Sequence, residues 1–315
     1  MVSCGRIASI NLMAGRDNME KLVTIAGTNA SGKSGLGIEL AKIYGAEIIS
    51  ADSRQVFEGL DLGSGKVTPE EMKEVKHHLI DVVKPNDLFS LTDFQRLAYE
   101  AIDDTLGRGK KAFLVGGTGL YVNSVVDGYN LNNIQIDPEI RQRVLDMSIE
   151  ELIELIKENT PDILDTIDIK NKRRLERACE KILCGDTAKR ENIKRYETLV
   201  LGVTWPREIL YERIRERLDR RLEQGMLDEV KNLRANGATD EFLYKLGLEY
   251  RYILMYLRGE FKNFNSFYDK LFMEIRHLAR EQMTWFRKRT DINWIDMQGD
   301  PISEAKCLIE KFYNM

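Results

Sequence analysis

The stretch GTNASGKS, residues 27–34, decides the fold of this chain. It matches the pattern G-x-x-x-x-G-K-[ST] in full, between the apolar run LVTIA, 22–26, and the helical pattern GLGIELAKIYG, 35–45. A strand, a glycine-rich turn and a helix in this order form a phosphate-binding loop, because the backbone N–H groups of the turn and of the helix N-terminus point at an anion. We therefore expect a P-loop on a parallel sheet.

We expect the P-loop residues to bind a polyphosphate together. Lys33 supplies a positive charge, and the hydroxyl of Ser34 is a ligand that suits Mg²⁺. We expect the whole loop to line the diphosphate site: Gly27, Thr28, Asn29, Ala30, Ser31, Gly32, Lys33 and Ser34. A loop of this kind binds a diphosphate or triphosphate tail whatever is attached to it, so the motif by itself does not identify the substrate.

Short runs rich in β-branched residues alternate with helical patterns over the first 128 residues. The runs predict strands at 23–27, 47–52, 78–83 and 111–117, and the apolar spacing of 93–109 predicts a helix. The run 198–205 returns to a strand pattern, long charged helices follow from 206 to about 236 and from about 264 to 289, and 293–297 is a candidate last strand. This alternation is typical of an α/β fold with a doubly wound parallel sheet.

The segment 130–197 interrupts this pattern. It contains the helical stretches IEELIELIKEN, 149–159, and KRRLERACEKIL, 172–183, and no convincing strand. We therefore predict a mostly helical insertion domain at 130–197, a core domain formed by 21–129 and 198–315, and a flexible N-terminal tail at 1–20. Between 170 and 195 the chain has ten Lys or Arg and four Asp or Glu. Such a basic segment is either a solvated helix face or the binding surface for a polyanion.

Composition excludes several classes of protein. The 315 residues are 43% hydrophobic and 31% charged, with a formal net charge of −4, which is typical of a globular protein and not of a general nucleic-acid coat. No apolar run reaches the roughly 18 residues of a membrane span. Four cysteines and three histidines form no zinc-binding cluster and no disulfide framework. We expect a cytoplasmic protein with no membrane partner.

Two residues at strand ends are candidates for catalysis. Asp52 ends the predicted strand 47–52, and the carboxyl ends of parallel strands face the ligand crevice. Asp52 is then a general base, a helix N-cap or a second Mg²⁺ ligand. Thr118 lies in the glycine turn of FLVGGTGLYV, 113–122, where it either caps the next helix or contacts the substrate.

Four motifs in this order resemble those of the tRNA dimethylallyltransferases. They are GTNASGKS at 27–34, ISADSRQVFEGLDLGSGK at 49–66, HHLIDVV at 77–83 and LVGGTGLY at 114–121. Looser similarity continues through 211–230, 246–260 and 278–289, and within the insertion mainly at RRLERA, 173–178. The resemblance therefore covers most of the chain.

The resemblance implies transfer of a dimethylallyl group from dimethylallyl diphosphate to the exocyclic amine of the adenosine immediately 3′ of the anticodon, with release of diphosphate and with Mg²⁺ as cofactor. Lys33, the loop amides, Mg²⁺ and an arginine would stabilise the charge that develops on the diphosphate. It also implies that Asp52 is the general base and that Thr118 lies beside it. Arg217 is the candidate for the diphosphate-binding arginine, and Arg213, on the same helical face, is its competitor.

The resemblance further implies contacts with the anticodon stem-loop of tRNA. The matching positions are Ser53, Arg54, Gln55 and Val56 after Asp52, and Arg173, Arg174, Leu175 and Arg177 in the insertion. The chain departs from the family at 247–250, where it has Gly-Leu-Glu-Tyr in place of G-Y-[KR]-[EQ], and this removes a basic residue from an expected RNA contact. One subunit can enclose the tRNA loop, so we expect a monomer.

Three other classes of function share some of these features. An adenylate isopentenyltransferase would carry out the same alkylation on a free nucleotide, and a P-loop small-molecule kinase would share the sheet and Mg²⁺. A non-enzymatic P-loop RNA-binding module would need the basic insertion but neither Asp52 nor Ser34. The motifs 52–66 and 116–121 and the basic insertion favour transfer to tRNA over all three.

Overall fold

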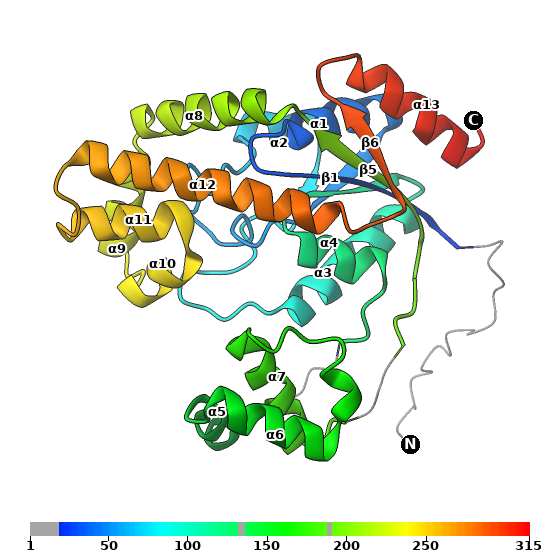
Figure 1. The fold of residues 1–315 in the computed structure, drawn as a ribbon. Helices are drawn as coiled ribbons and strands as arrows, with labels where there is room; N and C mark the ends of the chain where they lie inside the picture. Colours follow the sequence, from blue (N-terminus) through cyan, green and yellow to red (C-terminus); the bar gives the residue numbers. More distant parts are fainter. Residues whose placement is uncertain (1–18, 132–135, 188–190) are drawn as a thin grey trace, which may run out of the picture. The chain divides into compact units, whose positions relative to one another are not determined.

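A computed structural model describes residues 19–131, 136–187 and 191–315 of the chain. The described residues divide into two compact units. One contains the residues up to Gly128 together with Lys194–Met315, and the other lies within Tyr129–Ile193. Figure 1 shows both as ribbons. The predicted tail, 1–20, falls outside the described residues apart from its last two.

The larger unit is built on one six-stranded parallel sheet. Its strand order is β3-β2-β4-β1-β5-β6. The P-loop strand β1 therefore lies inside the sheet, between β4 and β5, which are not its neighbours along the chain. The strands are β1 Lys21–Gly27, β2 Ala46–Ser50, β3 His77–His78, β4 Lys111–Gly116, β5 Glu197–Thr204 and β6 Ile292–Asp296. The prediction of a doubly wound parallel sheet is confirmed.

Helices cover both faces of this sheet, because both faces of its strands are apolar. In β1, Leu22 and Ala26 pack against α3 and α4, whereas Val23 and Ile25 pack on the opposite face, toward α1 and α13. Continuous burial of this kind is the signature of a parallel sheet. The helices of these two layers are α1 Lys33–Tyr44, α2 Pro69–Glu74, α3 Leu91–Gly107, α4 Gly119–Val126 and α13 Pro301–Tyr313.

A group of helices with its own core belongs to the same unit (Figure 1). It consists of α8 Arg207–Glu223, α9 Met226–Ala235, α10 Asp240–Leu246, α11 Leu248–Leu257 and α12 Phe264–Phe286. Gly225, with a φ of +98°, separates α8 from α9 within the stretch predicted as helical. The aromatic residues Phe267 and Tyr250 are fully buried in this core, next to the apolar side of α8.

The strand predicted at 78–83 is wrong over most of its length. Only His77 and His78 form β3, and Val83 makes an isolated bridge with Phe57. Leu79 and Asp81 have φ values of +62° and +53°, which no strand accommodates. Of this run only Leu79 is buried, and Val82 is 45% exposed, so the β-branched composition of the run does not reflect a strand.

The smaller unit is helical in its described part. Its helices are α5 Pro138–Leu145, α6 Ile149–Asn159, the 3₁₀ turn η2 Pro161–Ile163 and α7 Lys172–Leu183. Ser148 begins α6 with a capping box to Glu151, and Leu152, Ile156 and Leu175 form a separate core. No helix in the described part of either unit has the length and apolar character that crossing a membrane requires.

Candidate active site

The P-loop backbone forms an anion-binding turn. Ala30 and Gly32 have left-handed φ values of +55° and +86°, and Gly32 is the N-cap of α1. Alternating left-handed residues turn successive N–H groups toward one point, and the N-terminus of α1 adds its positive dipole end. The loop is supported from outside, since Trp205 donates a hydrogen bond to the carbonyl of Ser31 (2.8 Å).

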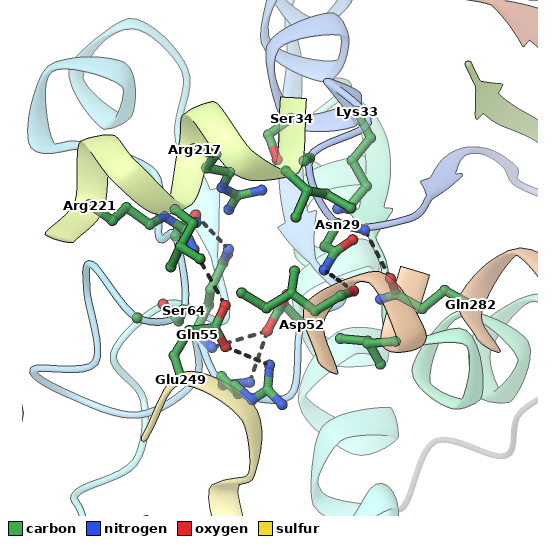
Figure 2. A pocket seen from close by; sticks show the side chains of 18 residues that line it. Asn29, Lys33, Ser34, Asp52, Gln55, Ser64, Arg217, Arg221, Glu249 and Gln282 are labelled. Atoms are coloured by element: carbon green, nitrogen blue, oxygen red, sulfur yellow. Dashed lines mark hydrogen bonds and ion pairs between the residues drawn. The ribbon is translucent and has the colours of Figure 1, made fainter. Parts of the chain in front are cut away.

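A cavity lies beside this loop (Figure 2). Charged side chains that are far apart in the sequence of the larger unit line it. Its volume is about 690 Å³, including the part that is open to solvent. The polar residues that line it are Asn29, Lys33, Ser34, Asp52, Arg54, Gln55, Ser64, Arg217, Arg221, Glu249 and Gln282. They come from the P-loop, the loop after β2, α8, α11 and α12, so tertiary folding alone brings them together.

The cationic side of the cavity is buried. Burial, together with the charges of Arg217 and Arg221, lowers the pKa of the Lys33 ammonium to about 8. The charge of Asp52 opposes this shift. Burial likewise lowers the pKa of Arg217 to about 9, and it lowers the pKa of Arg221. Three buried cations without a matching set of anions favour binding of a polyanion at this position.

Asp52 is held with one oxygen occupied and one available. Its Oδ1 accepts hydrogen bonds from the backbone N–H groups of Arg54 (2.9 Å) and Gln55 (3.4 Å). Within the described chain, no hydrogen bond or ion pair engages its Oδ2. Asp52 therefore caps the turn that follows β2 while it presents a carboxylate oxygen to the cavity.

Thr118 lies directly against this turn. Its Oγ1 accepts a hydrogen bond from the backbone N–H of Ser53 (3.1 Å), and its hydroxyl donates to the Ser53 side chain (3.4 Å). It occupies the N-cap position of α4, but its side chain makes no capping hydrogen bond. The capping interpretation of Thr118 is therefore wrong, and its hydroxyl is used to fix the segment after Asp52.

The structure separates the two candidate arginines of α8. Arg217 lines the cavity with Lys33 and Asp52. Arg213 donates from Nε to the carbonyl of Ala30 (3.0 Å), and its guanidinium lies 4.6 Å from the centre of the Trp205 ring. Arg213 therefore supports the P-loop backbone and also lines a neighbouring hollow along Gly32 and Lys33, whereas Arg217 lines both that hollow and the cavity that contains Asp52.

The sequence reading missed Arg221, Glu249 and Gln282. Arg221 follows Arg217 by four residues on one helical face, and this spacing was a usable signal. Gln282 of α12 accepts from the backbone N–H of Asn29 (2.9 Å) and donates to the carbonyl of Gly117 (2.9 Å), so it joins the P-loop to the turn before Thr118. Glu249 falls in the stretch 247–250, where the departure from the family pattern marks it, whereas nothing in the sequence near Gln282 points to that position.

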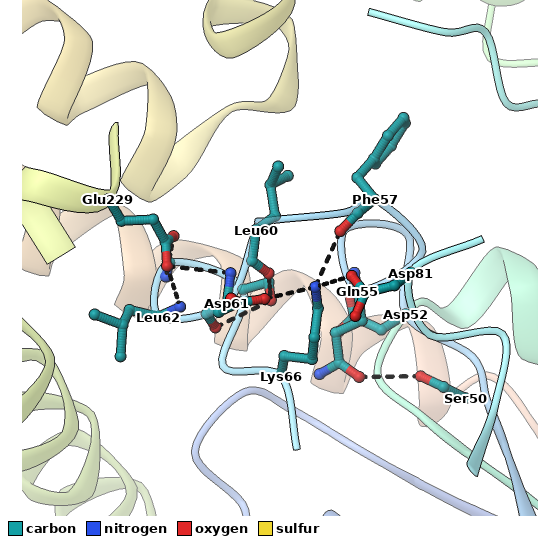
Figure 3. A network of polar contacts seen from close by, with 12 residues as sticks. Ser50, Asp52, Gln55, Phe57, Leu60, Asp61, Leu62, Lys66, Asp81 and Glu229 are labelled. Atoms are coloured by element: carbon teal, nitrogen blue, oxygen red, sulfur yellow. Dashed lines mark hydrogen bonds and ion pairs between the residues drawn. The ribbon is translucent and has the colours of Figure 1, made fainter. Parts of the chain in front are cut away.

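The loop between β2 and α2 carries Asp52 and is fixed at two points (Figure 3). Lys66 donates from Nζ to the carbonyl of Phe57 (3.0 Å) and pairs with the carboxylates of Asp61 and Asp81. The second point is Glu229 of α9, which accepts from three successive backbone N–H groups, those of residues 61, 62 and 63. The loop is thus held in one conformation although it contains little regular structure.

Gly65 lets this loop approach α8. Its φ is +63°, and a Cβ at this position would overlap the Nη2 atoms of Arg217 and Arg221. The amide of Gln55 donates to the carbonyl of Gly65 (3.2 Å). Glycine is therefore favoured here for its backbone conformation, and it leaves both guanidinium groups in their present positions.

The other residues predicted to bind tRNA lie in two places. Arg54 follows Asp52, and its Nε donates to the carbonyl of Leu246 (3.1 Å). Arg173, Arg174 and Arg177 lie exposed on α7 of the smaller unit, where Arg177 pairs with Glu180 (2.8 Å). Leu175 is fully buried in the core of that unit, so its place in the RRLERA motif is structural.

The paired histidines are structural. His77 contacts the carbonyl of Val75 (2.8 Å) through Nδ1. His78 contacts the buried carboxylate of Glu47 (2.7 Å) through Nε2, and Arg108 also pairs with that carboxylate. Both histidines therefore hold β3 and its surroundings in place.

The donor atoms of the cavity suit a hard cation that is shared with a phosphate. Ser34 and Asp52 offer a hydroxyl and a carboxylate on the same cavity wall. In the described part of the chain, no group of three or more His, Cys, Asp or Glu side chains could hold a metal by itself. This fits Mg²⁺, which is commonly bound through one or two protein oxygens and completed by phosphates and water.

The fold and the cavity together define a P-loop α/β protein with a buried cationic cavity beside a carboxylate. The family model described as IPP transferase matches residues 55–289. A second model, described as isopentenyl transferase, matches residues 20–87, the part that contains the P-loop.

Individual relatives match over nearly the whole chain. A protein of Pelobacter propionicus called tRNA dimethylallyltransferase 2 is 41% identical over 294 residues, which cover 91% of this chain and 93% of that protein. The solved full-length tRNA isopentenylpyrophosphate transferase of Bacillus halodurans is 36% identical, with a TM-score of 0.69 and coverage of 93% and 95%. A eukaryotic dimethylallyltransferase solved acting on tRNA shares the fold, with a TM-score of 0.79 at 23% identity over 94% of this chain and 80% of that one.

This chain belongs to the IPP transferase family. The resemblance to tRNA dimethylallyltransferases drawn from the four motifs is thereby confirmed.

Proposed function

We propose that this protein transfers a dimethylallyl group from dimethylallyl diphosphate to the exocyclic amine of the adenosine immediately 3′ of the anticodon in tRNA, and releases diphosphate. The observation that carries the proposal is the cavity in which Lys33, Arg217 and Asp52 face one another. It combines an anion site for a leaving diphosphate with a carboxylate for the proton of the nucleophile.

The cationic residues act on the leaving group. As the allylic carbon–oxygen bond breaks, negative charge builds on the diphosphate, and Lys33, Arg217 and the loop N–H groups are already placed around it. Groups that are fixed before the reaction need no reorganisation, and in a buried site they stabilise charge more strongly than in water. Ser34 would hold a Mg²⁺ ion, which supplies further neutralisation of the diphosphate charge when bound.

Asp52 acts on the acceptor. The adenine amine has little basicity, so it must lose a proton as its nitrogen bonds to the allylic carbon, and Oδ2 of Asp52 is available to accept that proton. Thr118 holds the backbone of Ser53 and thereby keeps the Asp52 turn in place. The adenine has to leave the stack of the anticodon loop to reach this cavity, as in other enzymes that modify a base.

The partners follow from this reaction. We propose that Arg54, with Ser53 and Gln55, contacts the nucleotides near the acceptor. Arg173, Arg174 and Arg177 of the smaller unit are proposed to contact the backbone of the tRNA stem-loop. We further propose that one chain acts alone and that it works in the cytoplasm, where its tRNA substrate is available.

A transfer assay tests the proposed reaction. Purified protein, Mg²⁺ and labelled dimethylallyl diphosphate are incubated with unmodified tRNA in one reaction and with AMP in another. We expect label in tRNA alone. Label in AMP alone would assign the chain to the free-nucleotide transferases, and label in neither would overturn the proposal and leave a kinase activity to be tested with ATP.

The role of Asp52 has its own test. Asp52→Asn keeps an Oδ1 acceptor for the two backbone N–H groups but removes the basic oxygen, so we expect unchanged donor binding and a loss of about 10²–10⁴-fold in turnover. Asp87→Asn, in an exposed loop of the same unit, is the matched control. A turnover of Asp52→Asn within a few-fold of the parent would exclude Asp52 as the base.

A further inference from the structure

The carboxylate of Glu249 has no part in the chemistry described above, although it lines the same cavity. Glu249 is 5% exposed and lies in the first turn of α11, where the helix N-terminus favours a negative charge. The turn that places it is unusual, because Gly247 and Leu248 have φ values of +75° and +39°. Strained backbone of this kind is retained where the position of the next side chain matters.

Two arginines flank this carboxylate, one on each side. Nη1 of Arg54 lies 3.7 Å from Oε2, and Nη1 of Arg221 lies 3.7 Å from Oε1. Both distances are too long for a hydrogen bond, and Oε2 is buried without a hydrogen-bond partner among the described residues. Burying a carboxylate oxygen without a hydrogen-bond partner costs free energy. The carboxylate of Glu249 therefore interacts with the two arginines through its charge and not through hydrogen bonds.

The two arginines lie on the sides of the cavity that are proposed to bind different substrates. Arg221 lies with Arg217 on the side of the diphosphate, whereas Arg54 follows Asp52 on the side proposed to contact tRNA. Glu249 is the anion that both arginines share. Its charge also opposes the effect of burial, which lowers the pKa of Arg217 and of Arg221.

The charge balance of the cavity shows what Glu249 changes. Four cationic side chains line the cavity, Lys33, Arg54, Arg217 and Arg221, together with two anionic ones, Asp52 and Glu249. The net charge of +2 would become +3 without Glu249. A diphosphate would then be bound more tightly, both as the donor's leaving group and as the released product. Tight binding of a product slows turnover, because product release limits many enzymes.

We propose that Glu249 is a positioning residue that divides the arginines of the cavity between the two substrates. It orients Arg54 for tRNA, and it moderates the anion affinity of Arg217 and Arg221 so that diphosphate can leave. The proposal rests on the proposed function for its tRNA part, whereas its diphosphate part requires only the cavity. It accounts for an acidic residue at a position where the family pattern has a basic one.

Glu249→Gln tests the proposal, since it keeps the shape of the side chain and removes the charge. Binding of inorganic diphosphate with Mg²⁺ is measured by calorimetry at neutral pH and fixed salt, and KM for tRNA and kcat are measured in the transfer assay. We expect diphosphate to bind about tenfold more tightly, because removal of one negative charge from the buried cavity lessens its repulsion of the anion. The KM for tRNA should rise about tenfold and kcat should fall. If Glu249 had a purely structural role, the variant would bind both diphosphate and tRNA more weakly. The proposal would be overturned if the dissociation constant for diphosphate and the KM for tRNA changed in the same direction, or if neither changed.

Two further variants complete the experiment. Glu249→Asp retains the charge in the cavity, but its shorter side chain withdraws from both arginines. We therefore expect an affinity for diphosphate close to that of the parent, because the net charge is unchanged, together with a raised KM for tRNA. This variant tests the proposal if Glu249→Gln does not fold. Glu241→Gln, an exposed acid in the first turn of α10, is the matched control and should change neither constant. A parent protein that transfers nothing to tRNA would refute the proposed function, while the diphosphate measurement would still test Glu249.

Discussion

The affinity of the anion site depends on whether Lys33 carries its proton. Its ammonium is buried beside Arg217 and Arg221, its pKa is lowered to about 8, and Asp52 is the acid whose charge opposes the shift. A bound diphosphate stabilises the charged form and raises this pKa again. Because only the charged form binds well, binding takes up a proton at pH values above the pKa of the empty site.

The affinity for diphosphate should therefore depend on pH in a defined direction. Relative to the affinity of a Lys33→Arg variant, we expect it to be constant below about pH 7 and to fall by up to tenfold per pH unit above about pH 8, as one proton on Lys33 is linked to binding. Calorimetric titration of inorganic diphosphate across this range measures it. Lys33→Arg is the comparison, since its guanidinium stays charged and the ionisation of the ligand is common to both proteins. An identical pH dependence in the two proteins would contradict the assignment.

At the scale of elements, the loop between β2 and α2 matters more than any helix. It contributes Asp52, Arg54 and Gln55 to the cavity, and it is held by Lys66 within the loop and by Glu229 of α9 (Figure 3). Loops that carry functional residues are usually fixed by a rigid scaffold. Here the scaffold is the helical group around α8 and α9, so those helices shape the site although they lie outside the sheet.

Gly65→Ala tests how closely this loop must approach α8. The added Cβ would displace the guanidinium groups of Arg217 and Arg221, so we expect the affinity for diphosphate to fall about tenfold or more while the protein stays folded. Gly109→Ala is the matched control, because Gly109 has a similar φ of +72° but no atom within 4 Å of the added Cβ. Both changes cost about 1–2 kcal/mol of backbone strain. Equal affinities in the two variants would show that the close approach is not needed.

At the scale of the whole molecule, the chain has two units with separate cores. Leu152, Ile156 and Leu175 pack together within the smaller unit, whereas the described residues that line the cavity belong to the larger unit. Changes on the surface of α7 should therefore affect tRNA binding and leave diphosphate binding unchanged.

Replacing Arg173 and Arg174 by Ala measures the contribution of α7. If both contact phosphates, the slope of log affinity for tRNA against log salt concentration should decrease in magnitude by about 1–2, because fewer counterions are released. Binding is followed by filter retention or anisotropy at several salt concentrations. Arg96→Ala, an exposed arginine of the larger unit, is the control. An unchanged slope would mean that the two arginines are only a solvated helix face.

Local patterns predicted those parts of the protein that local rules govern. The P-loop follows from the spacing of Gly27, Gly32 and Lys33, and five of the six strands follow from runs of β-branched residues. The strand predicted at 78–83 was wrong because the left-handed backbone at Leu79 and Asp81 ends the pairing after His78. Asp52 was placed correctly at a strand end, since every strand of a parallel sheet ends at the same edge.

The sequence by itself determined the α/β class, the phosphate-binding loop and the family, because these depend on residues that are neighbours along the chain. Only the tertiary structure decided that Arg217 faces the cavity while Arg213 supports the loop, and that Glu249 lies between Arg54 and Arg221. The physical reason is that charge and burial act through space. Residues far apart in the sequence share one desolvated cavity, and their pKa values and their partners are set by that cavity.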